Sequence, residues 1–165
     1  MRSRGFALVE LSLVIGLATI VGLGAWMAFG PTSVGTRIRQ EAANLTQLTD
    51  AIAADFAVAE GRYQSVSAAS AVERKLAPLA WADGQGLHSR TLGNIEISPL
   101  SAGQGFRITA TAVQANLCLE LVQSSARAFS EVHVNGVLVY SRRSLNHGAL
   151  AESCADGGEV AFDRV

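Results

Sequence analysis

The sequence contains no recognisable catalytic motif. Its serines stand in no nucleophile-elbow context, and Gly84-Gln-Gly86 has neither the preceding strand nor the helix-opening glycine of a phosphate-binding loop. The histidines His88, His133 and His147 are isolated, without metal-ligand spacing, so we interpret them as surface residues or as residues satisfied by their neighbours. We therefore expect no enzyme, no catalytic residue, no metal site and no cofactor.

Positive charge is also sparse. The chain has 13 Lys and Arg residues against 14 Asp and Glu residues, a formal net charge of −1. Arg37 with Arg39, and Arg142 with Arg143, form local pairs rather than the basic stripe on which nucleic-acid binding depends. We therefore expect no nucleic-acid partner. Such pairs usually belong to a solvated surface, although Arg142-Arg143, which follows an expected strand, could meet an acidic partner.

A long apolar run near the N-terminus organises the chain. From Phe6 to Phe29 it is interrupted only by two hydroxyl residues and one acid, Glu10. As a helix it would be about 36 Å long, which exceeds the roughly 30 Å hydrocarbon core of a bilayer. Arg2 and Arg4 precede the run, and no basic residue follows before Arg37. The positive-inside rule then predicts a cytoplasmic N-terminus and an extracytoplasmic remainder.

Glu10 is unusual within this run, because a carboxylate inside a bilayer is costly and calls for a partner. A short basic leader that ends in Gly5, followed by Phe6 and then Glu10, resembles the class III signal of type IV pilins and related pseudopilins. The resemblance implies that a prepilin peptidase cuts between Gly5 and Phe6 and methylates the new amine of Phe6. It also implies that Glu10 meets the N-terminal amine of a neighbouring subunit, which would relieve two desolvation penalties.

Two other interpretations of the N-terminus stay open. In an ordinary secretory signal, Leu11 to Val21 would form the apolar region and Gly22-Leu-Gly24 the cleavage site, but Glu10 would then have no purpose. In a plain single-span anchor, the cost of Glu10 would be tolerated near the interface.

One globular head is expected after the apolar run. An apolar stripe from about Arg37 to Tyr63 predicts an amphipathic helix, and Gly61 marks its C-terminus. That stripe consists of Ile38, Leu45, Leu48, Ile52, Phe56 and Tyr63. Glu41 and Asn44 are among the polar residues assigned to its wet face. Gly30-Pro31 and Gly35 predict a bend or local melting before this helix.

The rest of the head is predicted to combine short helices with antiparallel strands. A loop with a short helix ends before Pro78, and a turn follows at Asp83–Gly86. Strands are expected at 94–98, 106–113, 132–134, 137–140 and 160–162, and a helix at 114–129. Asn135-Gly136 is a strong hairpin signal between two of these strands.

The only two cysteines, Cys118 and Cys154, both follow the expected span and are too far apart for a CxxC redox site. In an oxidising compartment they predict one structural disulfide. A closed loop of this length stabilises a fold by roughly 4 kcal/mol in the chain-entropy description.

The C-terminal half extends the resemblance. A helix with the first cysteine, a strand ending in Val134-Asn-Gly136, and the stretch from Cys154 to Phe162 resemble type IVb pilins, especially the thin-pilus subunit of conjugative plasmids. The short leader and Phe6 are closer to the type IVa habit. The resemblance implies an α+β pilin fold, in which a long N-terminal hydrophobic and amphipathic helix packs on an antiparallel β-sheet head with one disulfide.

The resemblance also implies an organisation and a function. Residues 1–5 would be a leader, 6–30 a transmembrane and filament-core helix, and 31–165 the pilin head. The protein would be a structural subunit of a type IV pilus used for adhesion or conjugative mating, with a type II secretion pseudopilin as the alternative. Its partners would be the prepilin peptidase, identical subunits, the assembly platform in the inner membrane and a receptor on a recipient or host cell. It would reside in the inner membrane before assembly and in an extracellular filament afterwards.

Overall fold

A computed structural model describes residues 12–19, 21, 32–56, 63–82 and 86–165. The chain divides into two compact units, residues 1–37 and 38–165, and each is described by itself. In the first unit, residues 12–19 are helical, and Leu13, Val14, Ile15 and Leu17 expose more than half of their surface. No helix within the described residues is both long and apolar enough to cross a membrane. Most of the predicted span, 6–30, lies outside them.

Helix α2, Thr32–Phe56, follows the predicted amphipathic stripe. Ile38, Leu45, Leu48 and Ile52 are fully buried, because steps of three, four and seven keep them on one face of a helix. Gly35 lies inside α2, so the local melting expected there is wrong, because one glycine costs a helix only about 1 kcal/mol. Gly30 and Pro31, where a bend was also expected, lie outside the described residues. The predicted end at Gly61 falls outside the described residues.

Tyr63 and part of the polar face depart from the prediction. Tyr63 lies in a turn rather than on the helix, yet it is buried between the rings of Phe56 and Phe106, with centroids 6.3 and 5.0 Å away. Glu41 and Asn44 do not face water: Asn44 is buried and Glu41 is half-buried. The Glu41 carboxylate accepts hydrogen bonds from Trp81 Nε1 at 2.7 Å and from Ser89 Oγ at 2.8 Å. Glu41 therefore holds the segment that connects α2 to the sheet against the helix. Helical periodicity alone does not predict these contacts.

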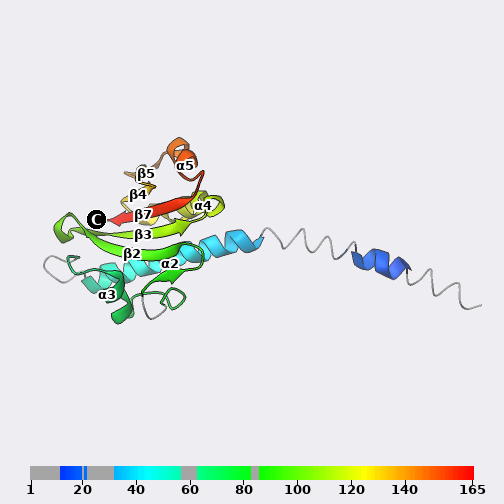
Figure 1. Cartoon of the computed structure of the whole chain (residues 1–165), viewed down its shortest axis with the longest axis horizontal. Coiled ribbons are helices and arrows are strands. Elements are labelled where there is room, and N and C mark those ends of the chain that lie inside the picture. The colour runs from blue at the N-terminus through cyan, green and yellow to red at the C-terminus, as the bar shows by residue number, and fades with distance from the viewer. Residues whose placement is uncertain (1–11, 20, 22–31, 57–62, 83–85) are drawn as a thin grey trace, which may run out of the picture. The chain divides into compact units, whose positions relative to one another are not determined.

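The head is built on one antiparallel sheet in the order β1-β2-β3-β7-β4-β5-β6, with α2 on its apolar face (Figure 1). Its strands are β1 His88–Ser89, β2 Gly93–Leu100, β3 Gly105–Val113, β4 Glu131–Val134, β5 Val137–Ser141, β6 Ser144–Leu145 and β7 Gly158–Arg164. All five predicted strands are confirmed. The sequence patterns did not reveal β1, β6 or the central position of β7, where the last strand pairs with both β3 and β4.

Helices and tight turns complete the head. They are α3 Ala68–Glu73, α4 Ala115–Ser125, α5 His147–Ser153 and the 3₁₀ turns η1 Ser101–Gly103 and η2 Ala126–Ala128. Helix α4 buries Leu117, Cys118, Leu121 and Val122 as predicted, although it ends four residues before Phe129. Asn135 and Gly136 connect β4 to β5 with φ of 50° and 81°, the geometry of a type I′ hairpin turn.

Candidate functional site

The predicted processing and assembly residues, Gly5, Phe6 and Glu10, lie outside the described residues. The predicted disulfide is confirmed. Cys118, on α4, is bonded to Cys154, the residue that ends α5, and their Cα atoms are 5.6 Å apart. Both cysteines are buried. The bond therefore holds the segment between β6 and β7 against the helix that follows β3.

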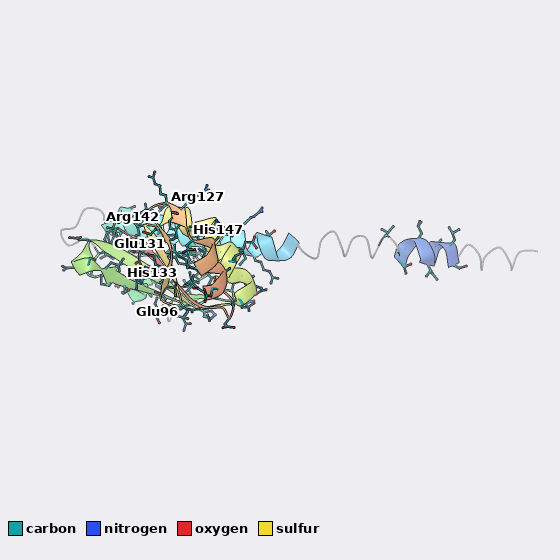
Figure 2. The ribbon with its side chains drawn as sticks, turned by 90° about the horizontal axis from the view of Figure 1, so that it is seen from above. Glu96, Arg127, Glu131, His133, Arg142 and His147 are labelled. Atoms are coloured by element: carbon teal, nitrogen blue, oxygen red, sulfur yellow. A yellow bond between two sulfur atoms is a disulfide. The ribbon has the colours of Figure 1, made fainter. Side chains whose placement is uncertain are left out.

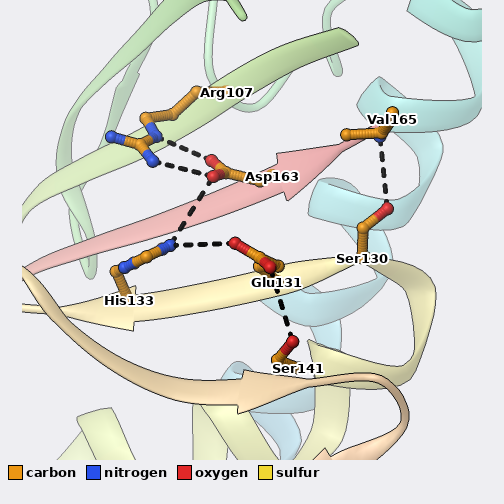
Figure 3. A network of polar contacts seen from close by, with 7 residues as sticks. All are labelled: Arg107, Ser130, Glu131, His133, Ser141, Asp163 and Val165. Atoms are coloured by element: carbon orange, nitrogen blue, oxygen red, sulfur yellow. Dashed lines mark hydrogen bonds and ion pairs between the residues drawn. The ribbon is translucent and has the colours of Figure 1, made fainter.

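A row of polar residues crosses the centre of the sheet. Register pairs Arg107 on β3 with Asp163 on β7, Asp163 with Glu131 on β4, and Glu131 with Ser141 on β5 (Figure 3). Arg107 donates to both oxygens of Asp163, from Nε at 2.6 Å and from Nη2 at 2.7 Å. This hydrogen bonding, more than the opposing effect of burial, raises the pKa of Arg107. Ser141 Oγ donates to Glu131 Oε1 at 3.4 Å.

His133 completes this network and corrects its interpretation as an isolated histidine. Its Nε2 is buried, makes no hydrogen bond with any described residue, and lies 3.6 Å from both Glu131 Oε2 and Asp163 Oδ2. The signal was present in the sequence, because residues i and i+2 of a strand share a face, so Glu131 and His133 point the same way. Glu131 and Asp163 lie directly opposite each other on β4 and β7, and two like charges in this position destabilise a sheet unless a cation such as Arg107 lies beside them.

The Glu131, His133 and Asp163 group has the spacing of a metal-ligand set, with one potential ligand atom from each residue within 4.8 Å of the others. The charges do not fit that use. Both oxygens of Asp163 already accept hydrogen bonds from Arg107, and a guanidinium at that distance would repel a cation. These residues therefore fit a cross-strand polar network and not a metal centre.

A pocket of about 710 Å³ opens at the end of the sheet where β7 finishes. Its walls come from η1, from η2 and the segment that joins it to β4, from the end of β5 and the turn that follows it, and from the end of β7. Four arginines line it, namely Arg127, Arg142, Arg143 and Arg164, together with the carboxylates Glu131 and Asp163. Figure 2 shows Arg127, Arg142 and Glu131 on this part of the head. Of these four arginines, only the Arg142-Arg143 pair is recognisable from the sequence.

The opposite end of the same strands is organised by Asn135. Its Nδ2 donates to the carbonyl oxygens of Ser153 at 2.9 Å and Gly157 at 2.8 Å, while its Oδ1 accepts from Glu159 N–H at 2.9 Å. The hairpin turn therefore fixes the chain that leads from α5 into β7. Because these contacts satisfy three backbone groups in a short connection, they define its conformation without a large apolar core.

We expect Gly157→Ala to lower the free energy of unfolding by about 2 kcal/mol. Gly157 has a φ of +70°, and a Cβ there would lie 2.5 Å from the carbonyl oxygen of Val113 and 2.8 Å from the amide nitrogen of Ala115. Gly136→Ala is the matched control, because Gly136 has a φ of +81° but nothing within 4 Å of an added Cβ. Urea unfolding measures both; equal losses would mean that strain alone, and not the close approach to Val113, requires glycine at position 157.

Comparison with known proteins identifies the family. A sequence model described as "PilS N terminal" matches residues 36–162. The chain belongs to this family of type IV pilins. No curated protein matches the sequence. Among solved structures, a type IVb pilin from Salmonella typhi superposes with a TM-score of 0.60 at 17% identity, over 76% of this chain and 97% of that one. TcpA, a type IV pilin from Vibrio cholerae El Tor biotype, gives 0.48 at 15% identity, over 76% and 99%.

The pilin family is structural, so this pilin is a structural subunit of a pilus and not an enzyme. Membership implies self-assembly into an extracellular filament. The α+β prediction is confirmed: this chain has a helix packed on an antiparallel sheet and one disulfide, and its fold is similar to that of the Salmonella pilin. The charged residues of the head are therefore to be interpreted as parts of a filament subunit.

Proposed function

We propose that this pilin is made as a precursor that a prepilin peptidase cuts between Gly5 and Phe6 and methylates at Phe6. Residues 1–5 are then a leader, 6–30 an anchor that becomes the filament core, and 31–165 the head. Before assembly the pilin resides in the inner membrane with its N-terminus in the cytoplasm, and the assembly platform then extracts it. The finished filament serves adhesion or conjugative mating through a receptor on another cell.

The observation that carries this proposal is the apolar helix at residues 12–19. Its large side chains, Leu13, Val14, Ile15 and Leu17, are exposed in the isolated chain. Exposed apolar side chains in this number need lipid or other helices around them. In a pilus the same helix is surrounded first by the membrane and then by its copies, which accounts for an apolar surface that one subunit leaves uncovered.

Intact mass and N-terminal sequencing of the protein from its native host test the processing step. We expect loss of residues 1–5 and one added methyl group on Phe6. Gly5→Val should leave the precursor uncut, because a branched side chain replaces the glycine at the cleavage site. A mature start near Ala25 would indicate an ordinary secretory signal, and an intact Met1 would indicate a plain anchor; either result contradicts the proposal.

Glu10→Ala tests the assembly step. The variant should be cut and methylated like wild type, but its yield of sheared filaments should fall at least about tenfold, because the amine of a neighbouring subunit loses its partner in an apolar core. Ser12→Ala is the control, since it changes a polar residue of the same run without removing a charge. A normal filament yield from Glu10→Ala would contradict the role proposed for this acid.

A further inference from the structure

One end of the head is strongly basic. Arg127, Arg142, Arg143 and Arg164 line the pocket at the end of β7, and we name these four residues the basic pocket. Among the described residues, none forms an ion pair with any of the four. Of the two acids in the pocket wall, Asp163 is paired with Arg107, so the four arginines outnumber the remaining acid, Glu131. Arg164 Nη1 already donates to the carbonyl oxygen of Ala128, so the available positive charge comes mainly from Arg127, Arg142 and Arg143.

The segment that precedes β7 has the opposite charge. Between Arg143 and Arg164 the sequence contains no lysine or arginine. Glu152, Asp156 and Glu159 are all exposed there, and we name these three residues the acidic segment. The disulfide at Cys154 and the hydrogen bonds from Asn135 hold this stretch in place. It is therefore a fixed acidic surface and not a loose tail.

The two surfaces lie at opposite ends of the same strands. Strand β7 begins at Gly158, beside the acidic segment, and ends at Arg164, in the basic pocket. Strand β5 runs from the Asn135-Gly136 turn, which binds the acidic segment, to the Arg142-Arg143 turn. Seven residues of strand span about 20 Å. In Figure 1 the end of β7 marked C and helix α5 lie toward opposite ends of this strand, so the charges cannot satisfy each other within one head.

The turn at Arg142 and Arg143 has a sequence that does not favour its backbone conformation, which suggests a role for the two side chains. The two residues connect β5 to β6 with φ of 51° and 66°, the same type I′ geometry that Asn135-Gly136 adopts at the other end of β5. Arginine has no preference for this left-handed conformation, whereas Asn-Gly does. The protein thus uses a favourable sequence at one turn and an unfavourable, doubly charged one at the other, and strain of this kind gathers at functional sites.

We propose that the basic pocket of one pilin binds the acidic segment of the next copy in the filament. Complementary patches at opposite ends of one subunit form a heterologous contact, and repetition of such a contact builds an open helical polymer. The complementary charges contribute more to the specificity and register of this contact than to its affinity. This inference rests on the filament function proposed above and adds the surfaces through which the heads meet.

Charge reversal in the full-length protein, expressed in its native host, tests the contact. Arg142→Glu with Arg143→Glu, and separately Glu152→Arg with Asp156→Arg, should each lower the yield of sheared filaments at least about tenfold. All four substitutions together should restore most of it, because the two surfaces are again complementary. Lys75→Glu with Arg90→Glu is the matched control, since it reverses two exposed basic residues outside the pocket.

Processing and folding are measured in the same cells, by the mature mass and by the disulfide on non-reducing gels. A wild-type strain without filaments would contradict the proposed function itself, whereas normal wild-type filaments isolate the head contact. The contact is overturned if either reversed pair assembles normally. It is also overturned if the filament yield of the combined variant, relative to wild type, is no higher than the product of the relative yields of the two separate variants. Filaments of normal yield that no longer attach to cells would assign the basic pocket to a foreign acidic partner instead.

A second variant separates assembly from stability. Arg142→Asn with Arg143→Gly gives the turn its favourable sequence, so the melting temperature should rise by about 3 °C while filament yield falls at least about fivefold. Loss of assembly in a more stable head cannot be ascribed to misfolding. An unchanged filament yield would show that the two arginines make no contact with the next subunit, and would overturn the proposal.

Discussion

Replacement of both Cys118 and Cys154 by alanine is expected to lower the free energy of unfolding by about 4 kcal/mol. The bond closes a loop with a sequence separation of 36, so its loss frees a long stretch of the unfolded chain. Alanine is preferred over serine because both sites are buried and a hydroxyl there would need a hydrogen-bond partner. A loss of this size is a large part of the stability of a typical domain.

The loss should be concentrated around α5. Within His147–Ser153 only Leu150 is buried, so this helix contributes little to the core and depends on its covalent link to α4. We therefore expect hydrogen exchange to quicken first between β6 and β7, before the central strands are affected. The acidic segment would lose its fixed position at the same time, and filament yield would fall with it.

Urea unfolding of the detergent-solubilised full chain measures this prediction. Trp81 is buried and reports on the head, and Trp26→Phe removes the only other tryptophan. Wild type with a reducing agent is the control, because it removes the same bond without a substitution. A double alanine variant that is as stable as the oxidised protein would mean that the disulfide closes a loop already ordered in the unfolded state.

Local patterns in the sequence predicted the local structure of the head well. The stripe of α2, the inward residues of α4 and the Asn135-Gly136 hairpin all follow from periodicity or turn chemistry within a few residues. The order of the strands could not be predicted in this way. β7 lies between β3 and β4, and pairing between such distant segments depends on packing that no short pattern encodes.

The charged surfaces show the same limit. Polar residues on an amphipathic helix are expected to face solvent, so the pattern does not predict the contacts of Glu41 with Trp81 and Ser89. The basic pocket was visible only as the Arg142-Arg143 pair, because Arg127 and Arg164 come to it from other strands and turns. A group assembled from distant segments has no sequence spacing by which it could be recognised.

Asp163→Ala is expected to lower the free energy of unfolding by about 3 kcal/mol. Asp163 is buried at the centre of the sheet, and it accepts two hydrogen bonds from Arg107. Its removal leaves that guanidinium without its carboxylate and places His133 beside Glu131 alone. The effect stays at the lower limit for a buried pair because the Arg107 side chain is 36% exposed and water can solvate part of the freed charge.

Asp156→Asn is the matched control, since this exposed acid forms no ion pair among the described residues and its loss should change stability by less than about 0.5 kcal/mol. A double-mutant cycle with Arg107→Ala separates the pair from its surroundings and should give a coupling of about 1–3 kcal/mol. If Asp163→Ala were no more harmful than Asp156→Asn, the polar row would contribute nothing to the sheet. A strong effect of Asp163→Ala without coupling to Arg107 would assign its role to His133 and the strand backbone instead.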